Sequence, residues 1–166
     1  MNSEIIRKEC CTMNLRRILD LAEAKAKELN SKHIHVSHIL FAIVAFESCH
    51  AVRLLKELGC DTEALQKKLG EVLSRMQESE GSSNASDTSE AKCTFRTCHV
   101  IGLATDEAVR ERKGFVYSHH MLLGILAGGQ GAAFDLLTES GISGALVRDK
   151  YAEFTAEPVE NDLVPG

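Results

Sequence analysis

The sequence contains a long stretch that is written twice at a fixed spacing. The segment SHILFAIVAFESCHAVRLLKELG, residues 37–59, has a gap-free counterpart 82 positions later in HHMLLGILAGGQGAAFDLLTESG, residues 119–141. Between residues 11 and 73, sixteen of the 63 positions are identical to the residue 82 places further on, where average amino-acid usage would give about 4. A repeated unit of this kind buries its apolar face against its twin, so the duplication constrains the fold more than any other feature.

Each copy has the apolar spacing of four successive helices. Thr12 and Thr94 are suitable N-caps for the first helix of each copy. Behind Thr12, apolar residues recur at the helical period, namely Leu15, Ile18, Leu19, Ala22, Ala26 and Leu29. Gly59 and Gly141 are placed to end the third helix of each copy. The pattern predicts an all-α fold of eight helices, built as two four-helix repeats in a pseudo-twofold arrangement.

The predicted domain organisation follows the repeat and the changes in composition. Residues 78–92, ESEGSSNASDTSEAK, contain no large apolar side chain and are typical of a flexible linker. We therefore predict these parts, in chain order: an N-terminal lead-in (1–10), the first repeat (11–77), the linker (78–92), the second repeat (93–155) and a polar tail (156–166).

Charge and hydropathy argue against two classes of partner. The net charge of −5 disfavours sequence-independent binding of nucleic acid, which requires a basic surface. The longest apolar run, residues 39–46, is far too short to span a bilayer, so no membrane partner is expected. The first residues, MNSEIIRKECC, lack the apolar core of a signal peptide. These features predict a cytoplasmic protein in a reducing compartment.

The familiar catalytic and nucleotide-binding motifs are missing. The sequence has no GxxxxGK[ST], GxSxG or HExxH pattern. The Gly-rich stretch at residues 128–131 falls between two predicted helices, where a turn explains it better than a phosphate cradle. We therefore predict no catalytic residue, no cofactor and no ATP hydrolysis, and a protein that is not an enzyme.

Histidines and cysteines are the residues that suggest other chemistry. His33, His35 and His38 lie close together in the sequence and His119 adjoins His120. Because His38 and His120 are equivalent positions of the repeat, we interpret them as structural and predict no metal site. The six cysteines show no CxxC spacing and are expected to be mainly structural. Exposed thiols, with Cys10, Cys11 and Cys98 as candidates, are the redox-sensing alternative.

The ordered set of segments resembles a known family. In the first copy these are CTMNLRRILDLAEAKA, VSHILFAIV and AVRLLKELGCDTEAL, and in the second CTFRTCHVIGLATDEA, YSHHMLLGIL and AAFDLLTESG. Duplicated, they resemble the N-terminal Clp repeat domain of Clp-family AAA+ unfoldases of the ClpC and ClpA type. The resemblance covers about residues 11–155, and the ATPase modules that follow in the family are absent from this sequence.

The resemblance implies a non-catalytic protein-recognition module. Its expected partners are Clp ATPase or protease subunits, adaptors or substrate proteins, with an accessory or adaptor-like role as a stand-alone copy of the domain. The resemblance also makes the plastid stroma an alternative to the cytoplasm. A sequestering protein that senses a small molecule, a metal or redox state on the same fold is the alternative function.

The resemblance also points to a binding cleft at the helix starts. By position it would include Thr12, Ser37, Thr94 and His119, which match the threonines and the acidic residue that hold phosphoarginine in some relatives. The acidic residue of the family's Thr-Glu-His pattern is replaced here, by Ser37 in the first copy and His119 in the second. Because a guanidinium group needs a charged acceptor, we predict weak phosphoarginine binding at this cleft.

Overall fold

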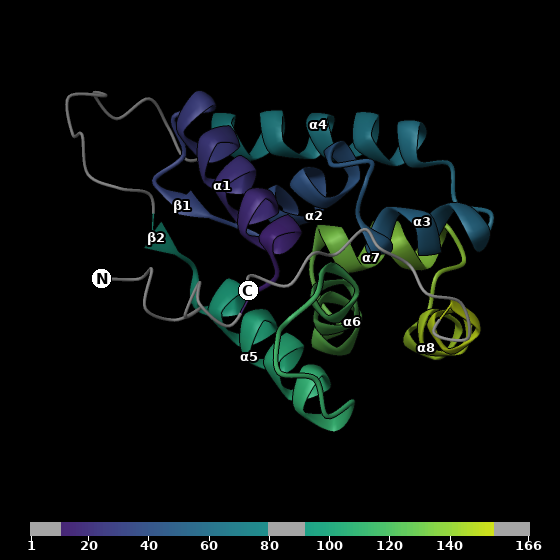
Figure 1. Cartoon of the computed structure of the whole chain (residues 1–166). Helices are drawn as coiled ribbons and strands as arrows, with labels where there is room; N and C mark the ends of the chain where they lie inside the picture. Colours follow the sequence, from purple (N-terminus) through teal and green to yellow (C-terminus); the bar gives the residue numbers. More distant parts are fainter. Residues whose placement is uncertain (1–10, 80–91, 155–166) are drawn as a thin grey trace.

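The computed structural model describes residues 11–79 and 92–154, and this part of the chain is almost entirely helical (Figure 1). Two strands of two residues each accompany eight helices within these ranges. In chain order the elements are α1 (Met13–Glu28), β1 (His33–Ile34), α2 (Val36–Ala45), α3 (His50–Glu57), α4 (Thr62–Ser79), β2 (Lys92–Cys93), α5 (Phe95–Arg110), α6 (Ser118–Gly128), α7 (Ala132–Glu139) and α8 (Gly144–Phe154). The prediction of an all-α fold is confirmed.

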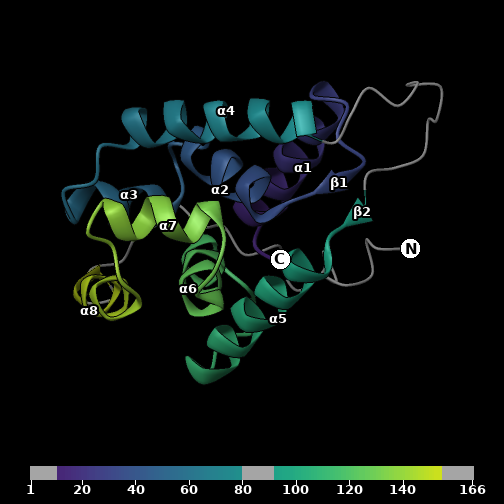
Figure 2. The ribbon, with the colours of Figure 1, turned by 180° about the vertical axis from the view of Figure 1, so that it is seen from behind.

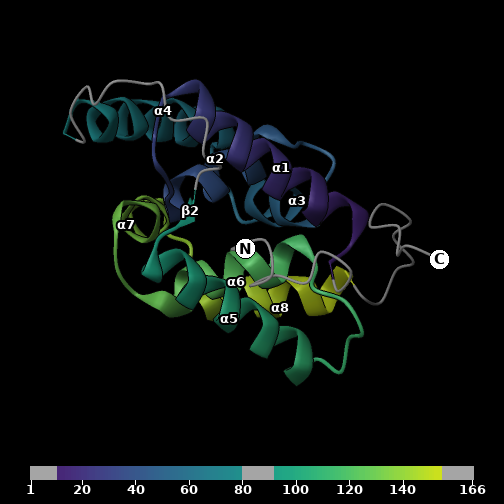
Figure 3. The ribbon, with the colours of Figure 1, turned by 90° about the vertical axis from the view of Figure 1, so that its left-hand side faces the viewer.

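The two sequence repeats form two stacked layers of helices. Helices α1–α4 make one layer and α5–α8 make the other, as Figure 1 and its side view in Figure 3 show. The view from behind (Figure 2) shows α4 along the outer edge of the first layer and α5 along the outer edge of the second. The layers therefore follow the duplication seen in the sequence.

Local chemistry sets where the helices begin and end. The hydroxyls of Thr12 and Thr94 accept hydrogen bonds from the backbone N–H of Leu15 and Thr97, so both threonines are N-caps, as predicted. Gly59 follows the last residues of α3 with a φ of 84°, a left-handed conformation that glycine adopts without steric cost. Its repeat counterpart Gly141 has a φ of 79° and ends α7 in the same way.

The chain segments that lead into α1 and α5 cross between the layers. The N–H of Thr12 donates to the carbonyl of Val116 at 3.1 Å, and the N–H of Thr94 donates to the carbonyl of Ile34 at 3.3 Å. These two bonds are related by the 82-residue offset, and β1 and β2 form the parallel pair beside the second one. Each half thus supplies the backbone partner for the start of the other half's first helix.

Helix packing between the layers is reciprocal as well. Helix α2 packs against α7 while its counterpart α6 packs against α3. Helix α4 likewise packs against α7, and its counterpart α8 packs against α3. One continuous apolar core runs through both halves, so neither half buries its apolar residues alone.

The closest helix pair in the second half depends on a glycine. A Cβ placed on Gly124 of α6 would lie 2.6 Å from the carbonyl oxygen of Val100 and 3.1 Å from the Cβ of Ala104, both on α5. Glycine at this position therefore allows α6 to approach the backbone of α5, because no side chain separates them. Its repeat counterpart, Ala42, is buried in α2.

The fourth helix of the first half extends into the predicted linker. Helix α4 continues to Ser79, so the predicted linker starts two residues inside a helix, and the rest of that linker is mostly outside the described residues. The predicted lead-in and tail lie outside them too. In the described ranges, no single helix has the length and apolar composition of a membrane span. The bent pairs α2–α3 and α6–α7 meet those criteria only when joined.

Candidate functional site at the helix starts between the halves

The four residues predicted to form a cleft lie at the crossing between the layers. The bond from Thr12 to Val116 joins the start of α1 to the segment that leads to His119. The bond from Thr94 to Ile34 joins the start of α5 to the segment that leads to Ser37. Thr12 and His119 are fully buried, and Ser37 is 5% exposed. Thr94 alone among the four is partly exposed. Three of the four side chains are thus packed inside the protein rather than presented to solvent.

The repeated histidines have the same structural role in the two halves. His38 and His120 occupy the third position of α2 and α6, and the Nδ1 atom of each accepts the N–H of the residue before its helix. The donors are His35 and Tyr117, each at 2.9 Å. A glutamate or glutamine at this position makes the equivalent bond in a capping box. The interpretation of these histidines as repeated structural residues agrees with this geometry.

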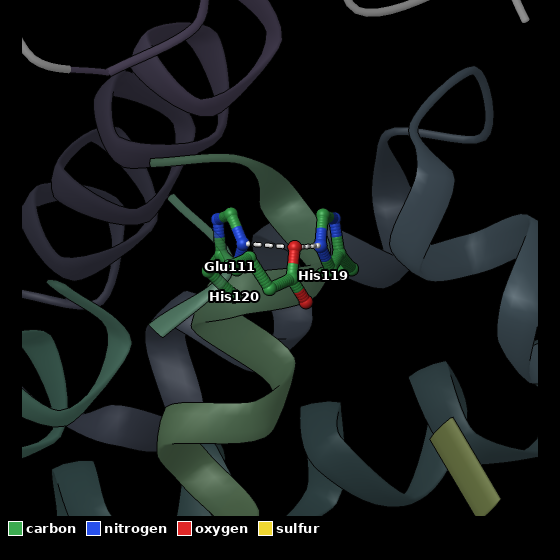
Figure 4. Close-up of side chains that lie close together, drawn as sticks. All are labelled: Glu111, His119 and His120. Atoms are coloured by element: carbon green, nitrogen blue, oxygen red, sulfur yellow. Dashed lines mark hydrogen bonds and ion pairs between the residues drawn. The ribbon is translucent and has the colours of Figure 1, made fainter. Parts of the chain in front are cut away.

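A half-buried carboxylate links His119 and His120. Glu111, the C-cap residue of α5, places Oε2 2.9 Å from the Nε2 of His120 and 3.2 Å from the Nε2 of His119. Figure 4 shows the carboxyl group of Glu111 between the two imidazole rings. Both rings are fully buried, whereas the Glu111 side chain is 23% exposed, so two enclosed Nε2 atoms pair with a carboxylate at the edge of the core. This link ties the end of α5 to the start of α6.

Burial and hydrogen bonding set the charges of this cluster. Burial opposes ionisation of Glu111, but the hydrogen bonds from His119 and His120 outweigh it and hold the pKa of this carboxyl well below its usual range. Burial lowers the pKa of His119 to about 4, against the opposing hydrogen bond to Glu111. At neutral pH the cluster is therefore a carboxylate that accepts hydrogen bonds from a neutral His119 and from His120.

The ring of His119 also anchors the last helix. It stacks on Tyr151 of α8 with the ring centroids 3.6 Å apart and the planes 20° from parallel. The ring of His50, at the start of α3, lies 6.2 Å from Tyr151 and 6.3 Å from His119. Side chains from three helices and both halves thus meet around His119. Among the residues that the structure describes, no hydrogen-bond partner faces the Nδ1 atom of His119, which is an energetic cost to the fold.

The Glu111, His119 and His120 side chains have the residue types of a metal site, and their possible ligand atoms lie within 4.8 Å of one another. The hydrogen bonds do not fit that role. A neutral imidazole has one nitrogen with a free lone pair, and His120 uses it at Nδ1 to accept the N–H of Tyr117. His120 can bind a metal through Nε2 only if this capping bond is lost. The cluster is better described as a structural link.

Of the thiols proposed as redox sensors, the structure describes Cys11 and Cys98. Cys11 is fully buried, contrary to the expectation that it is exposed, because the segment before α1 pairs with Val116 in the other half. Cys98 is half-buried, and Cys10 lies outside the described residues. Burial raises the pKa of Cys93 to about 11, which keeps this thiol protonated and weakly nucleophilic at neutral pH.

The most exposed large apolar side chain among the described residues is Phe95, at the first position of α5. It is 91% exposed, while its repeat counterpart Met13 is 38% exposed. Next to it, Arg96 reaches towards the turn between α6 and α7 and donates to Gln130 at 3.4 Å. Sequence reasoning missed Phe95. The available signal was an apolar residue directly after an N-cap, outside the apolar stripe of its helix.

Sequence reasoning also missed Glu111. It lies in the connection after α5, where a charged residue is unremarkable, and nothing local indicates that it faces two buried histidines.

The prediction of weak phosphoarginine binding stays a prediction. The burial of Ser37 and His119 favours it, because neither side chain is available to a guanidinium group from solvent.

The fold and the crossing of the helix starts define a class of protein, the duplicated all-helical domains with two four-helix repeats. The match to a family model is more specific. Residues 11–100 match the Clp repeat (R) N-terminal domain, so this chain belongs to the Clp repeat N-terminal domain family. The matched range includes the whole first repeat and the start of α5.

Individual relatives agree with this assignment. The chain is 32% identical over 132 residues to the negative regulator of genetic competence ClpC/MecB of Bacillus subtilis, which covers 80% of this chain and 15% of that protein. It is 31% identical over 112 residues to the chloroplastic ATP-dependent Clp protease ATP-binding subunit CLPT4 of Chlamydomonas reinhardtii, which covers 68% of this chain and 45% of that protein. The chain therefore spans only part of the length of both relatives.

A solved structure shares the fold. The N-terminal domain of Hsp104 from Candida albicans superposes with a TM-score of 0.74 and 17% sequence identity. The superposition covers 92% of this chain and 99% of that domain. At this level of identity the likeness concerns the fold alone.

Proposed function

We propose that this protein is a non-catalytic recognition module that acts as an accessory or adaptor-like factor of Clp protease, by binding an adaptor, a substrate protein or a Clp subunit. The observation that carries the proposal is membership of the Clp repeat N-terminal domain family together with an intact pair of repeats. A relative that is 31% identical is by name an ATP-binding subunit of Clp protease. The proposed compartment is the cytoplasm or the plastid stroma.

The histidines of the Glu111 cluster are enclosed, which argues against a catalytic role for them. Glu111, His119 and His120 are paired with one another, and both histidines are shielded from solvent. A general acid or base must reach a substrate within hydrogen-bond distance, and these imidazoles are enclosed. No observation favours the metal or redox alternative, because His120 uses its free lone pair for a cap and Cys11 is buried.

The test is direct binding of the whole chain to purified Clp components. The ATPase, the peptidase core and known adaptors of the source organism are each immobilised, and binding of the chain is measured by interferometry and checked by crosslinking. We expect saturable binding to at least one component. Absence of binding to every component, with a chain shown to be folded by its cooperative thermal transition, would contradict the proposal.

A further inference from the structure

The start of α5 and the neighbouring strand pair carry an exposed aromatic ring and three exposed cations. We call this the basic-aromatic surface, and it consists of Lys32, Lys92, Phe95 and Arg96. We propose that the basic-aromatic surface docks an acidic peptide segment of a partner protein, one that also carries an apolar side chain. This inference rests on the proposed function, because it names the surface and the partner chemistry through which recognition takes place.

The backbone brings the members of this surface together. The N–H of Lys92 donates to the carbonyl of Lys32 at 3.2 Å, and Lys92 pairs with His33 in the parallel register, so the backbones of the two lysines lie close together although they belong to different halves. Phe95 and Arg96 follow at the first two positions of α5. Figure 1 shows β1 and β2 adjacent to each other, with α5 starting directly after β2. The surface therefore exists only when the two halves are assembled.

Phe95 supplies the apolar part of the surface. It is 91% exposed and lies outside the core, so it contributes little to folding. Aromatic side chains are the residues most often found at the energetic centre of protein interfaces, because covering one ring removes a large apolar area from water. A single exposed apolar residue is common, and the charges around this one distinguish it.

The three charged residues of the surface are positive, and the Glu23 carboxylate of α1 lies near enough to Cys93, beside Lys92, to contribute to the raised pKa of that thiol. Residues 31–35 and 92–99 contain Lys32, Lys92 and Arg96 and no carboxylate, although the whole chain has a net charge of −5. Within the described residues, none of these three cations has a carboxylate within ion-pair distance, and Arg96 bonds to the neutral side chain of Gln130. The first turn of α5 adds the positive end of the helix dipole. An acidic segment complements this charge.

A partner's acidic segment fits the surface better than the other possible occupants do. A second copy of the chain would bring the same cations against each other, which is unfavourable. Nucleic acid requires a more extensive basic surface and a chain that does not repel it through its overall charge. A short acidic peptide with one apolar side chain offers carboxylates to the three cations and an apolar contact to the ring of Phe95.

The test uses a fluorescein-labelled peptide in which Glu alternates with Leu and Phe, together with its counterpart in which Gln replaces Glu. Binding to the whole chain is followed by fluorescence anisotropy at low and high salt. We expect the acidic peptide to bind more tightly than the Gln peptide and to weaken as salt rises. Phe95→Ala should weaken binding at least about tenfold, and Lys32→Gln with Lys92→Gln about threefold to tenfold.

Matched variants provide the controls. Val109→Ala removes another exposed apolar side chain from α5, and Lys56→Gln with Lys67→Gln makes the same change in net charge at exposed sites elsewhere. These variants should change affinity by no more than about twofold. Equal binding of the two peptides, equal losses in test and control variants, or tighter binding of a single-stranded RNA of equal charge would overturn the proposal.

The outcome separates this inference from the proposed function. If the chain binds a Clp component and that binding is unchanged by Phe95→Ala with Lys92→Gln, the docking surface is wrong and the function stands. If the chain binds the acidic peptide as expected but no Clp component, the surface stands and the function is wrong. The thermal midpoint of each variant is measured in parallel to show that the exposed substitutions leave the fold intact.

Discussion

The hydroxyl of Ser118 accepts a hydrogen bond of 3.2 Å from the backbone N–H of Ala51. Ser118 is the first residue of α6 in the second half, and Ala51 is in the first turn of α3 in the first half. The residue before α3, Cys49, makes no side-chain cap of its own. A serine from one repeat therefore caps a helix of the other repeat, at a position that is fully buried.

Removing this cap should destabilise the whole protein. Ser118→Ala leaves the buried N–H of Ala51 without this acceptor, which is expected to lower the free energy of unfolding by about 1–3 kcal/mol. Urea denaturation followed by circular dichroism measures the change. Ser74→Ala is the control, because that exposed hydroxyl only bonds back to the carbonyl of Gly70 within α4; its effect should stay within about 0.5 kcal/mol. Equal effects of the two substitutions would contradict the capping role.

Two glycines in the second half should respond to alanine with opposite signs. Gly124→Ala places a Cβ 2.6 Å from the carbonyl oxygen of Val100, so a destabilisation of about 1–3 kcal/mol is expected. Gly102 lies on the exposed side of α5 with no atom near its would-be Cβ. Gly102→Ala should therefore stabilise the protein by about 0.5–1 kcal/mol through helix propensity. The thermal midpoints of the two variants measure both effects. A higher midpoint for Gly124→Ala would refute the close approach of α5 and α6.

Acid should destabilise this protein through the cluster around Glu111. The pKa of His119 is about 4 in the folded chain and 6.5 without burial, so the unfolded state binds the proton first as pH falls. Stability is then lost between about pH 6.5 and 4, by about 3 kcal/mol for this group. The lowered pKa of Glu111 acts in the same direction below pH 4.5, because its stabilisation exists only while the carboxylate is charged.

The variant His119→Phe tests the source of this acid sensitivity. Phenylalanine keeps a ring next to Tyr151 but cannot be protonated. The loss of stability between pH 6.5 and 4, measured by urea denaturation at each pH, should become smaller by roughly the amount assigned to His119. Because the comparison is made within each variant, a constant packing cost of the larger ring does not affect it. An unchanged pH dependence would show that other groups are responsible.

The two halves should depend on each other for folding. Cleavage at Ser83, between the repeats, is expected to leave the halves associated, because the cross-layer bonds and the reciprocal helix packing remain. Each half alone has roughly 65 residues, a size at which a lone core is marginal. Size-exclusion chromatography of the cleaved chain and calorimetry of each separate half provide the measurements. Sharp, independent transitions of the separate halves would contradict this expectation.

The sequence by itself determined the repeat and the local structure. The 82-residue offset predicted which helices correspond, Thr12 and Thr94 predicted where the first helices begin, and Gly59 predicted where α3 ends. The equivalence of His38 and His120 predicted a shared structural role. These features could be read because a cap, a helix period or a left-handed glycine depends on residues within one turn of the chain.

The tertiary structure decided the contacts that cross between distant segments. Ser118 and Ala51 are 67 residues apart, and no local pattern in either helix indicates their bond. The same holds for Glu111 opposite His119 and for the burial of Ser37 and His119. Side-chain burial and partners depend on how the two layers of helices pack against each other. Periodicity predicts which face of a helix is apolar, but not which residues of the other half that face will meet.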